Sequence, residues 1–398
     1  MNRILIIITS CLFFISGKLY AQRDLEHTTN WAYQLQNMDI NAIAANDSFQ
    51  LMVSDYSHDG TDGNKLTPTE VATVKNSGKL FISYISIGEA EDYRSYWQGS
   101  WSPGSPAWLD SVNPDWAGNY KVRYWDSAWQ KIVYNYVDTI INQGFDGIYL
   151  DIIDAWYYWQ SEVSVGRQIP NADSLMIDFV LKIRNHVNSV TGTSHFIIMP
   201  QNGEDLIFQN NISPTQKNQY YSAIDALGIE DVFFIGPNNE DNPFTPDYYR
   251  IQNLQLYQAQ GKKIFNIEYL TQSAKIREYK DTAQYYSFVP YACTRALDQL
   301  CNTIPLAIPE VQDGNLKIYP NPVNGDEVFI ISQTSLCSAF RIELLDMAGR
   351  TIQMESLQPS AQWAHVQLKI PSSIPNGIYN LCLHNNTQTS NHRIILLR

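Results

Sequence analysis

The sequence lacks the short motifs that mark several large enzyme classes. It has no H-E-x-x-H, no G-x-S-x-G, no G-x-G-x-x-G and no P-loop, so the usual signs of zinc proteases, serine hydrolases, dinucleotide enzymes and nucleoside triphosphatases are missing. The seven His residues are scattered, and only His58 lies near the end of a predicted strand. We therefore expect a chemistry that needs neither a metal ion nor an organic cofactor.

Charged residues are few, and basic residues are fewer than acidic ones. Asp, Glu, Lys and Arg make up 17% of the 398 residues, and the formal net charge is −13. A negative chain is repelled by nucleic acid and by anionic membrane surfaces, and it attracts cationic partners. We therefore expect no nucleic-acid partner and favour a cationic substrate, although an ordinary acidic secreted protein is an equal alternative.

Long apolar runs are confined to the N-terminus. Arg3, the apolar stretch 4–15 and the segment Leu19–Ala21 before Gln22 form the pattern of a secretory signal peptide over residues 1–21. The apolar stretch is too short for a comfortable membrane span, and no later segment qualifies. The sequence thus predicts a secreted mature chain without a transmembrane segment.

Cysteine is also sparse, and four Cys residues remain after removal of the signal peptide. Cys293 and Cys301 lie in a predicted helix, about 12 Å apart along its axis, which is too far for a disulfide within that helix. Cys337 and Cys382 either pair across a small sheet or remain free thiols. None of the spacings matches a zinc site.

From about residue 27 to 300, short apolar runs alternate with helical patterns, which is typical of β/α units and a parallel sheet. Eight runs over about 270 residues predict a TIM-like (β/α)8 barrel at residues 22–303, with an open doubly wound sheet as the alternative. The runs are Trp31–Leu35, Gln50–Ser54, Lys79–Ile87, Gly147–Leu150, His195–Met199, Ala226–Ile229, Lys263–Ile267 and Phe288–Ala292.

Helix signals separate these runs. Thr67–Glu70 form a capping box, and apolar residues at helical spacing precede Gly144 and Gly192, where we expect two helices to end. Long loops follow the third and fourth runs, at Glu89–Tyr124 and Asp151–Pro170. Loops of this length are commonly functional.

Acidic residues recur where the predicted strands end. Aspartate is unfavourable in strands. A carboxylate at the end of a buried strand must be hydrated, be paired with a cation or a hydrogen-bond donor, or be used in binding or catalysis. One such acid would be explained as a helix cap, but five predict a cluster on the face of a barrel that carries the active site. The five are Asp55, Glu89, Asp151, Glu230 and Glu268.

Asp151 and Glu230 are the predicted catalytic pair. They follow the fourth and sixth runs, two strands apart, so both can face one substrate across a pocket. Glycoside hydrolysis requires one carboxyl group that protonates the leaving oxygen and another that attacks the anomeric carbon or activates water. A helix cap or a structural ion pair is the alternative for each residue.

The two long loops carry polar and aromatic residues suited to sugars. Arg94 is expected to orient an acid or bind a hydroxyl, while Glu91 and Asp92 are expected to pair with an amine; a solvated loop with an internal ion pair is the alternative. Eight of the ten Trp residues fall between positions 97 and 159, and 156–159 are consecutive aromatics. Aromatic faces stack on sugars and on cations.

Five segments of the predicted barrel resemble glycoside hydrolase family 114, which includes endo-α-1,4-polygalactosaminidases. This resemblance implies a TIM-like barrel and cleavage of α-1,4-linked galactosamine polymers with retention of configuration. The five segments are Phe145–Trp156, Tyr84–Trp97, Met199–Asp205, Gly228–Phe233 and Phe265–Leu270.

The resemblance also implies roles for individual residues. Asp151 corresponds to the nucleophile and Glu230 to the acid/base. The residues expected to bind substrate around them, some from the family pattern and some as their neighbours, are Asp55, Tyr56, Glu89, Glu91, Asp92, Tyr93, Arg94, Asp154, Trp156, Asn202, Glu268 and Tyr269.

Beyond a Pro-containing linker at residues 304–314, short alternating strands predict a small all-β sandwich over residues 315–398. Three segments there, Leu316–Pro322, Leu345–Arg350 and Ile374–Tyr379, resemble the C-terminal sorting domain of the type IX secretion system. This resemblance implies export across an outer membrane by that machinery, followed by release or surface attachment. An ordinary carbohydrate-binding sandwich is the alternative.

The sequence therefore predicts a secreted endo-glycosidase that acts on a cationic, amino-sugar-rich polysaccharide such as α-1,4-polygalactosamine. Two alternatives remain open. One is a glycosidase acting on another α-galactoside or hexosaminide, and the other is a non-catalytic surface protein that binds polysaccharide. The cleavage pattern, the stereochemical course and the oligomeric state also remain open.

Overall fold

A computed structural model of the protein describes residues 24–192, 195–301, 316–323, 325–332, 340–346, 350–357, 365–384 and 389–397. The predicted signal peptide, residues 1–21, and the predicted linker, residues 304–314, lie outside these ranges. The chain divides into two units, Met1–Thr303 and Ile304–Arg398, which are described separately below.

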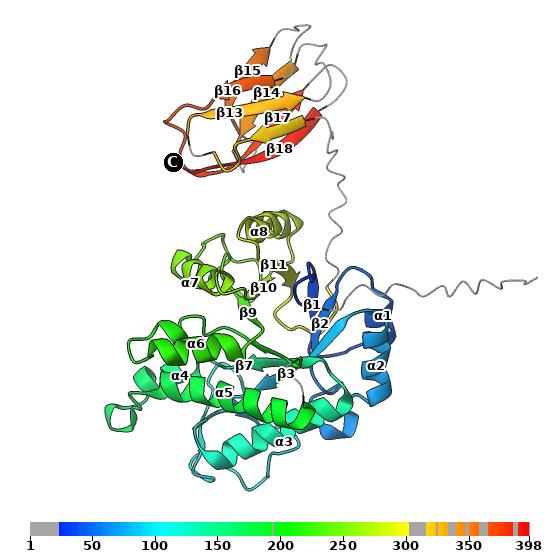
Figure 1. The fold of residues 1–398 in the computed structure, drawn as a ribbon, viewed down its shortest axis with the longest axis vertical. Coiled ribbons are helices and arrows are strands. Elements are labelled where there is room, and N and C mark those ends of the chain that lie inside the picture. Colours follow the sequence, from blue (N-terminus) through cyan, green and yellow to red (C-terminus); the bar gives the residue numbers. More distant parts are fainter. Residues whose placement is uncertain are drawn as a thin grey trace, which may run out of the picture. The chain divides into compact units, whose positions relative to one another are not determined.

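Eight parallel strands form the centre of the first unit, and helices lie around them (Figure 1). The strands belong to two sheets, and each strand overlaps one of the eight predicted runs. One sheet has the order β1 (Trp31–Tyr33), β2 (Leu51–Ser54), β3 (Leu80–Ser86), β7 (Gly147–Asp151), β8 (Ile197–Pro200). The other has the order β11 (Val289–Cys293), β10 (Lys263–Tyr269), β9 (Ala226–Glu230).

Hydrogen bonds connect the two sheets. Asn202 N donates to Gly228 O and Asp225 N to Ile198 O, both at 2.9 Å, and these bonds join β8 to β9. On the other side, Trp31 Nε1 donates to Val289 O at 3.0 Å, between β1 and β11. Because the strands within each sheet and the bridge between the sheets are parallel, the carboxyl ends of the strands share one edge.

The predicted helix boundaries follow local chemistry. Thr67 and Glu70 form the capping box of α2, and Gly144 and Gly192 end α3 and α5 with φ of 93° and 67°. Such positive φ values favour glycine because it has no Cβ. The helices are α1 (Ile40–Ala45), α2 (Pro68–Asn76), α3 (Ser127–Gln143), α4 (Ala155–Tyr157), α5 (Ala172–Thr191), α6 (Pro214–Ala223), α7 (Tyr248–Gln258) and α8 (Ser273–Tyr285).

The first long loop is not irregular, because it folds into a small antiparallel sheet. Its strands are β4 (Glu89–Glu91), β5 (Leu109–Val112) and β6 (Asn119–Val122), in the order β4-β6-β5. The second long loop contains α4 and two short helical turns, Tyr158–Glu162 and Val165–Arg167. Both loops begin at the carboxyl ends of parallel strands, β3 and β7.

The prediction that Cys293 and Cys301 cannot pair is wrong. The segment is not a helix: β11 ends at Cys293, and the chain then turns back, so the two Cα atoms lie 5.3 Å apart and the residues form a disulfide. Cys382 is a buried free thiol on β17 (Gly377–His384). Its possible partner, Cys337, lies outside the described residues.

The second unit is all-β in the residues that the structure describes. One antiparallel sheet has the order β12 (Leu316–Tyr319), β13 (Glu327–Ser332), β16 (His365–Lys369). The other has the order β15 (Thr351–Leu357), β14 (Phe340–Leu345), β17, β18 (Thr389–Leu396). Side chains from both sheets, among them Val328, Leu344 and Leu381, share one apolar core. Strands β12 and β15 were not predicted from the sequence.

Within the described ranges, no helix has the length and apolar character that a membrane crossing requires.

Candidate active site

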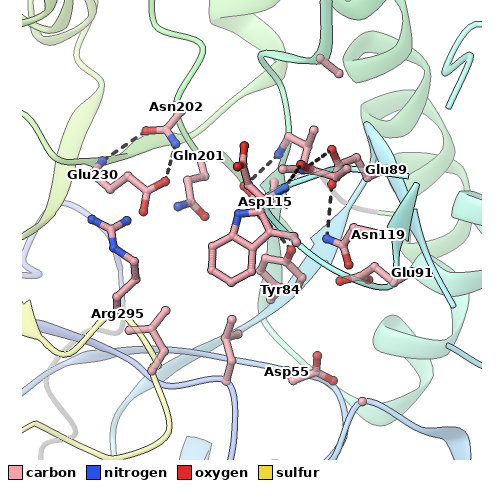
Figure 2. A pocket seen from close by; sticks show the side chains of 18 of the residues that line it. Asp55, Tyr84, Glu89, Glu91, Asp115, Asn119, Gln201, Asn202, Glu230 and Arg295 are labelled. Carbon is pink, nitrogen blue, oxygen red and sulfur yellow. Dashed lines mark hydrogen bonds between the residues drawn. The ribbon is translucent and has the colours of Figure 1, made fainter. Parts of the chain in front are cut away.

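A cavity of about 1050 Å³ lies at the carboxyl edge of the parallel strands (Figure 2). Every parallel strand contributes a lining residue at or near its end. In chain order these residues are Tyr33, Asp55, Tyr84, Asp151, Gln201, Glu230, Tyr269 and Arg295. Convergence of strand-end side chains on one cavity is the arrangement in which parallel α/β folds hold their active sites.

Asp151 ends β7, and both of its carboxylate oxygens accept hydrogen bonds. The Tyr84 hydroxyl donates to Oδ2 at 2.7 Å, and the Ile152 amide donates to Oδ1 at 2.8 Å. Burial, followed by the charge of Glu230, raises the pKa of Asp151 from 3.8 to about 8. The carboxyl groups of Asp151 and Glu230 are therefore close enough to influence each other's ionisation.

Glu230 ends β9, and both of its carboxylate oxygens are also bonded. Asn202 Nδ2 donates to Oε1 at 2.8 Å (Figure 2), and the Tyr269 hydroxyl donates to Oε2. Asn202 is held in turn, because its Oδ1 accepts from the Glu230 amide at 3.2 Å. Asn202 adopts φ of 59°, a left-handed conformation that Asn tolerates better than most residues. In this conformation, the side chain of Asn202 bonds both the carboxylate and the backbone amide of Glu230.

Gln201 lies between the strands that carry the two acids. Leu150 pairs with Pro200 across β7 and β8, and Gln201 forms a parallel bridge with Gly228 of β9. Adjacent strands are about 4.8 Å apart, so the backbones of β7 and β9 are separated by about 10 Å. Side chains that project from both strands into the space between can reach a single sugar linkage.

Tyr33 lines the same cavity as both acids. Its hydroxyl donates to Gln201 Oε1 at 3.3 Å, and its side chain lines the cavity. The pKa of Tyr33 is raised well above its ordinary value, first by burial and then by neighbours that include both Asp151 and Glu230.

Asp55, Glu91 and Arg94 form a buried charge cluster on the β2–β3 side of the cavity. Arg94 contacts Asp55 Oδ2 through Nη1 and Glu91 Oε2 through Nε, both at 2.7 Å. Its guanidinium lies 5.9 Å from the ring centroid of Tyr84, the tyrosine that bonds Asp151. Burial raises the pKa of Asp55 to about 6, although Arg94 opposes this change. The cluster thus supports the wall next to Asp151.

Glu89 and Asp154 are two further acids of the cavity lining. Glu89 is fully buried and forms an ion pair with Lys121 Nζ at 2.6 Å. Burial and the charge of Glu230 raise the pKa of Asp154 to about 6, while Lys121 lowers it. Lys121 therefore lies close to two acids of the cavity.

Eleven predicted site residues line the cavity and three do not. Tyr56 is buried and donates to Asp62, Asp92 is exposed, and Glu268 is buried on β10. Glu268 precedes Tyr269 in β10, and only Tyr269 lines the cavity, because successive side chains in a strand point to opposite sides. The eleven are Asp55, Glu89, Glu91, Tyr93, Arg94, Asp151, Asp154, Trp156, Asn202, Glu230 and Tyr269.

Four of the eight strand-end lining residues were not predicted: Tyr33, Tyr84, Gln201 and Arg295. Three of them are uncharged, so a search for acids at strand ends does not find them. Arg295 lies 3.9 Å from the ring centroid of Tyr269 and bonds Asp231 Oδ2 through Nη2 at 2.7 Å. A sequence signal existed for Tyr33, which stands near the end of the first predicted strand as the acids do on others.

The described residues contain no group of three or more His, Cys, Asp or Glu side chains arranged to hold a metal ion. Carboxylates, amides and aromatic hydroxyls line the cavity, together with the cationic Arg94, Lys121 and Arg295. Such a set can donate and accept protons, and it can form hydrogen bonds to sugar hydroxyls and amines.

Curated proteins similar to this chain come from distant prokaryotes. The uncharacterized protein MJ1477 of Methanocaldococcus jannaschii is 38% identical over 279 residues, which cover 68% of this chain and 77% of that protein. An uncharacterized protein of Thermotoga maritima is 34% identical over 308 residues, which cover 75% of this chain and 91% of that protein.

Among solved structures, the glycoside hydrolase domain of PelA from Pseudomonas aeruginosa is similar in fold, with a TM-score of 0.50 and 14% identity. The match covers 68% of this chain and 97% of that domain. Residues 18–305 match the model of glycoside-hydrolase family GH114, and residues 317–397 match that of the secretion system C-terminal sorting domain. Since the first match spans well over half of the sequence, the chain belongs to glycoside-hydrolase family GH114 and ends in a secretion sorting domain.

Proposed function

We propose that the protein is a secreted endo-glycosidase that cleaves an amino-sugar polysaccharide, with α-1,4-linked polygalactosamine as the first substrate to test. The family match supports glycoside hydrolase activity, and the proposal adds the identity of the polymer that is cleaved. One observation supports the proposed reaction most directly. Asp151 and Glu230 line the same cavity from strands separated by β8 alone, and each carboxylate accepts a hydrogen bond from a tyrosine hydroxyl.

The proposed mechanism uses the two carboxyl groups in sequence. Glu230 donates its proton to the glycosidic oxygen while Asp151 attacks the anomeric carbon, which gives a glycosyl ester on Asp151. Glu230 then takes a proton from water, and this water cleaves the ester with net retention. The eight strand-end lining residues fit a closed (β/α)8 barrel around this site, which we include in the proposal.

The charge of the cavity favours a cationic substrate. Ten acidic residues line it, against three Lys and Arg residues. Asp151 attacks only when ionised, yet its pKa in the free protein is about 8. A positive charge within about 4–6 Å lowers the pKa of a carboxyl group. An ammonium group on the substrate would therefore promote the ionised form of Asp151 that the reaction needs.

The direct test is incubation of the protein with de-N-acetylated galactosaminogalactan, followed by mass spectrometry of soluble oligosaccharides. We expect oligomers of galactosamine from the wild-type protein and none from Asp151→Asn. Proton NMR of the first product should show the α-anomer, as retention requires. Release of galactose from simple α-galactosides, without cleavage of the polymer, would favour the alternative specificity.

A second candidate, a surface protein that binds polysaccharide without cleaving it, predicts polymer retention with no new reducing ends. The same incubation separates the two functions, because a reducing-end assay measures cleavage and sedimentation with the insoluble polymer measures binding.

Export is the final part of the proposal. The sorting domain at residues 317–397 supports delivery to the outside of the cell by the type IX secretion machinery. Deletion of residues 315–398 in a type IX-competent host should retain the protein inside the outer membrane. Detection of the truncated protein in the medium at wild-type levels would contradict this assignment.

A further inference from the structure

The turn between β5 and β6 places an exposed tryptophan in the wall of the cavity. Residues Asn113, Asp115, Trp116, Ala117 and Asn119 all line it. Among the Trp residues that the structure describes, Trp116 alone is mostly exposed, at 57%. A single exposed aromatic is common on protein surfaces, so its meaning depends on its setting.

The backbone of this turn is held at both ends. Asn113 N donates to Asn119 O at 2.7 Å, and Asn119 N donates to Trp116 O at 3.1 Å. From outside the turn, Asp92 N donates to Gly118 O at 2.8 Å. Gly118 has φ of 92°, which a residue with a Cβ adopts only with strain. The ring of Trp116 is thus presented on a defined backbone.

The buried carboxylate of Glu89 adds a second anchor. Asn119 Nδ2 donates to its Oε2 at 3.3 Å (Figure 2), and Asn113 Nδ2 donates to its Oε1 at 2.9 Å. One buried acid therefore fixes both ends of the turn. Lys121 balances its charge. A buried, charge-balanced acid therefore holds the turn that carries the exposed Trp116 in the cavity wall.

We propose that the Asn113–Asn119 turn is a preformed subsite for an amino sugar of the polymer, outside the linkage that is cleaved. Trp116 stacks on the apolar face of that sugar, and the exposed Asp115 beside it pairs with the ammonium group. The indole face attracts cations through its quadrupole, and a preorganised ring loses little entropy on binding. The substrate class rests on the proposed function, but the predicted binding does not require cleavage.

The test measures binding of the full chain to soluble de-N-acetylated galactosaminogalactan by affinity electrophoresis, in the Asp151→Asn background so that no turnover occurs. Trp116→Ala should weaken binding about five- to tenfold, Trp116→Phe less, and Asp115→Asn about threefold. Matched controls on other surfaces are Tyr248→Ala, an exposed aromatic on α7, and Asp178→Asn on α5. Neither control should change binding.

Equal binding by Trp116→Ala and Tyr248→Ala would overturn the subsite, as would absence of any polymer binding by the parent. Trp116→Phe, which keeps an aromatic ring, separates loss of stacking from a folding defect. Failure of the proposed function is seen separately, as an absence of new reducing ends with the wild-type protein. Weaker binding by Trp116→Ala would support the subsite in that case too.

Discussion

Glu230 and Glu268 stand at the ends of adjacent parallel strands, yet their surroundings differ. Glu230 lines the cavity, where its carboxylate accepts from Asn202 Nδ2 and the Tyr269 hydroxyl. Glu268 is fully buried away from the cavity lining, and its carboxylate accepts three backbone amides, those of Val232, Phe233 and Phe234. The first acid is available to a substrate, and the second is used to hold the segment that follows β9.

An acid at a strand end is therefore not by itself a catalytic signal. Glu268 and Tyr269 are neighbours on β10, and the side that each faces decides its role. Asp151 lines the cavity as Glu230 does, so it differs from Glu268 in the same way. The contrast between cavity acids and buried structural acids leads to four testable expectations.

Removal of either proposed catalytic acid should have the largest effect. Asp151→Asn and Glu230→Gln should each lower kcat by about 10³-fold or more, because each removes a group that acts on the reacting bond. The melting temperature at pH 5 should stay within a few degrees of wild type. Reducing-end kinetics and calorimetry check the two statements, and a variant with near-normal kcat would exclude that residue from the mechanism.

Glu268→Gln should show the opposite behaviour to Glu230→Gln. Its side-chain amide would face one of the three backbone N–H groups and leave that donor unsatisfied. The expected loss is about 1–3 kcal/mol in the free energy of unfolding, with kcat on the polymer close to wild type. Urea denaturation beside an activity assay is the measurement. A large fall in kcat without loss of stability would place Glu268 in the catalytic machinery and refute the contrast.

Tyr84→Phe should reduce activity about tenfold at neutral pH and change its pH dependence. The Tyr84 hydroxyl favours the ionised form of Asp151, whose pKa is already raised to about 8 by burial and by Glu230. Since the ionised form attacks, kcat/KM should rise with pH toward 8 in the wild-type protein. Loss of the hydroxyl raises the pKa of Asp151 further and moves this rise to higher pH.

A pH profile of kcat/KM for Tyr84→Phe tests this expectation, with Tyr248→Phe as a control outside the cavity lining. An unchanged profile for Tyr84→Phe would mean that ionisation of Asp151 does not limit the reaction.

Salt should have the smallest effect. The excess of acidic side chains in the cavity should steer a cationic polymer, so kcat/KM should fall about two- to fivefold between low ionic strength and about 0.3 M salt. An uncharged substrate supplies the matched control. A fall of the same size with both substrates would show that steering of the amine is not the cause.

The predicted features that the structure confirms depend on local sequence. The apolar runs mark all eight parallel strands, Thr67 and Glu70 form the predicted capping box, and Gly144 ends its helix. Each of these features depends on residues only a few positions apart, so the local sequence is sufficient to predict it.

Features that depend on how the chain turns or on contacts between elements were predicted less well. The Cys293–Cys301 disulfide was missed because the segment turns back after β11 instead of forming a helix. The turn carrying Trp116 was not distinguished from the rest of its loop, because its anchor, Glu89, lies on another strand. The sequence alone also assigned Tyr56, Asp92 and Glu268 to a cavity that they do not line.

Apolar periodicity and strand direction are properties of the sequence, so they were sufficient to predict which elements form and that acids gather at one edge of the parallel strands. Which acids reach the cavity, and which tyrosines support them, depends on how these elements pack together. The reason is geometric: adjacent side chains in a strand point to opposite sides, and the surrounding elements determine which side is the cavity.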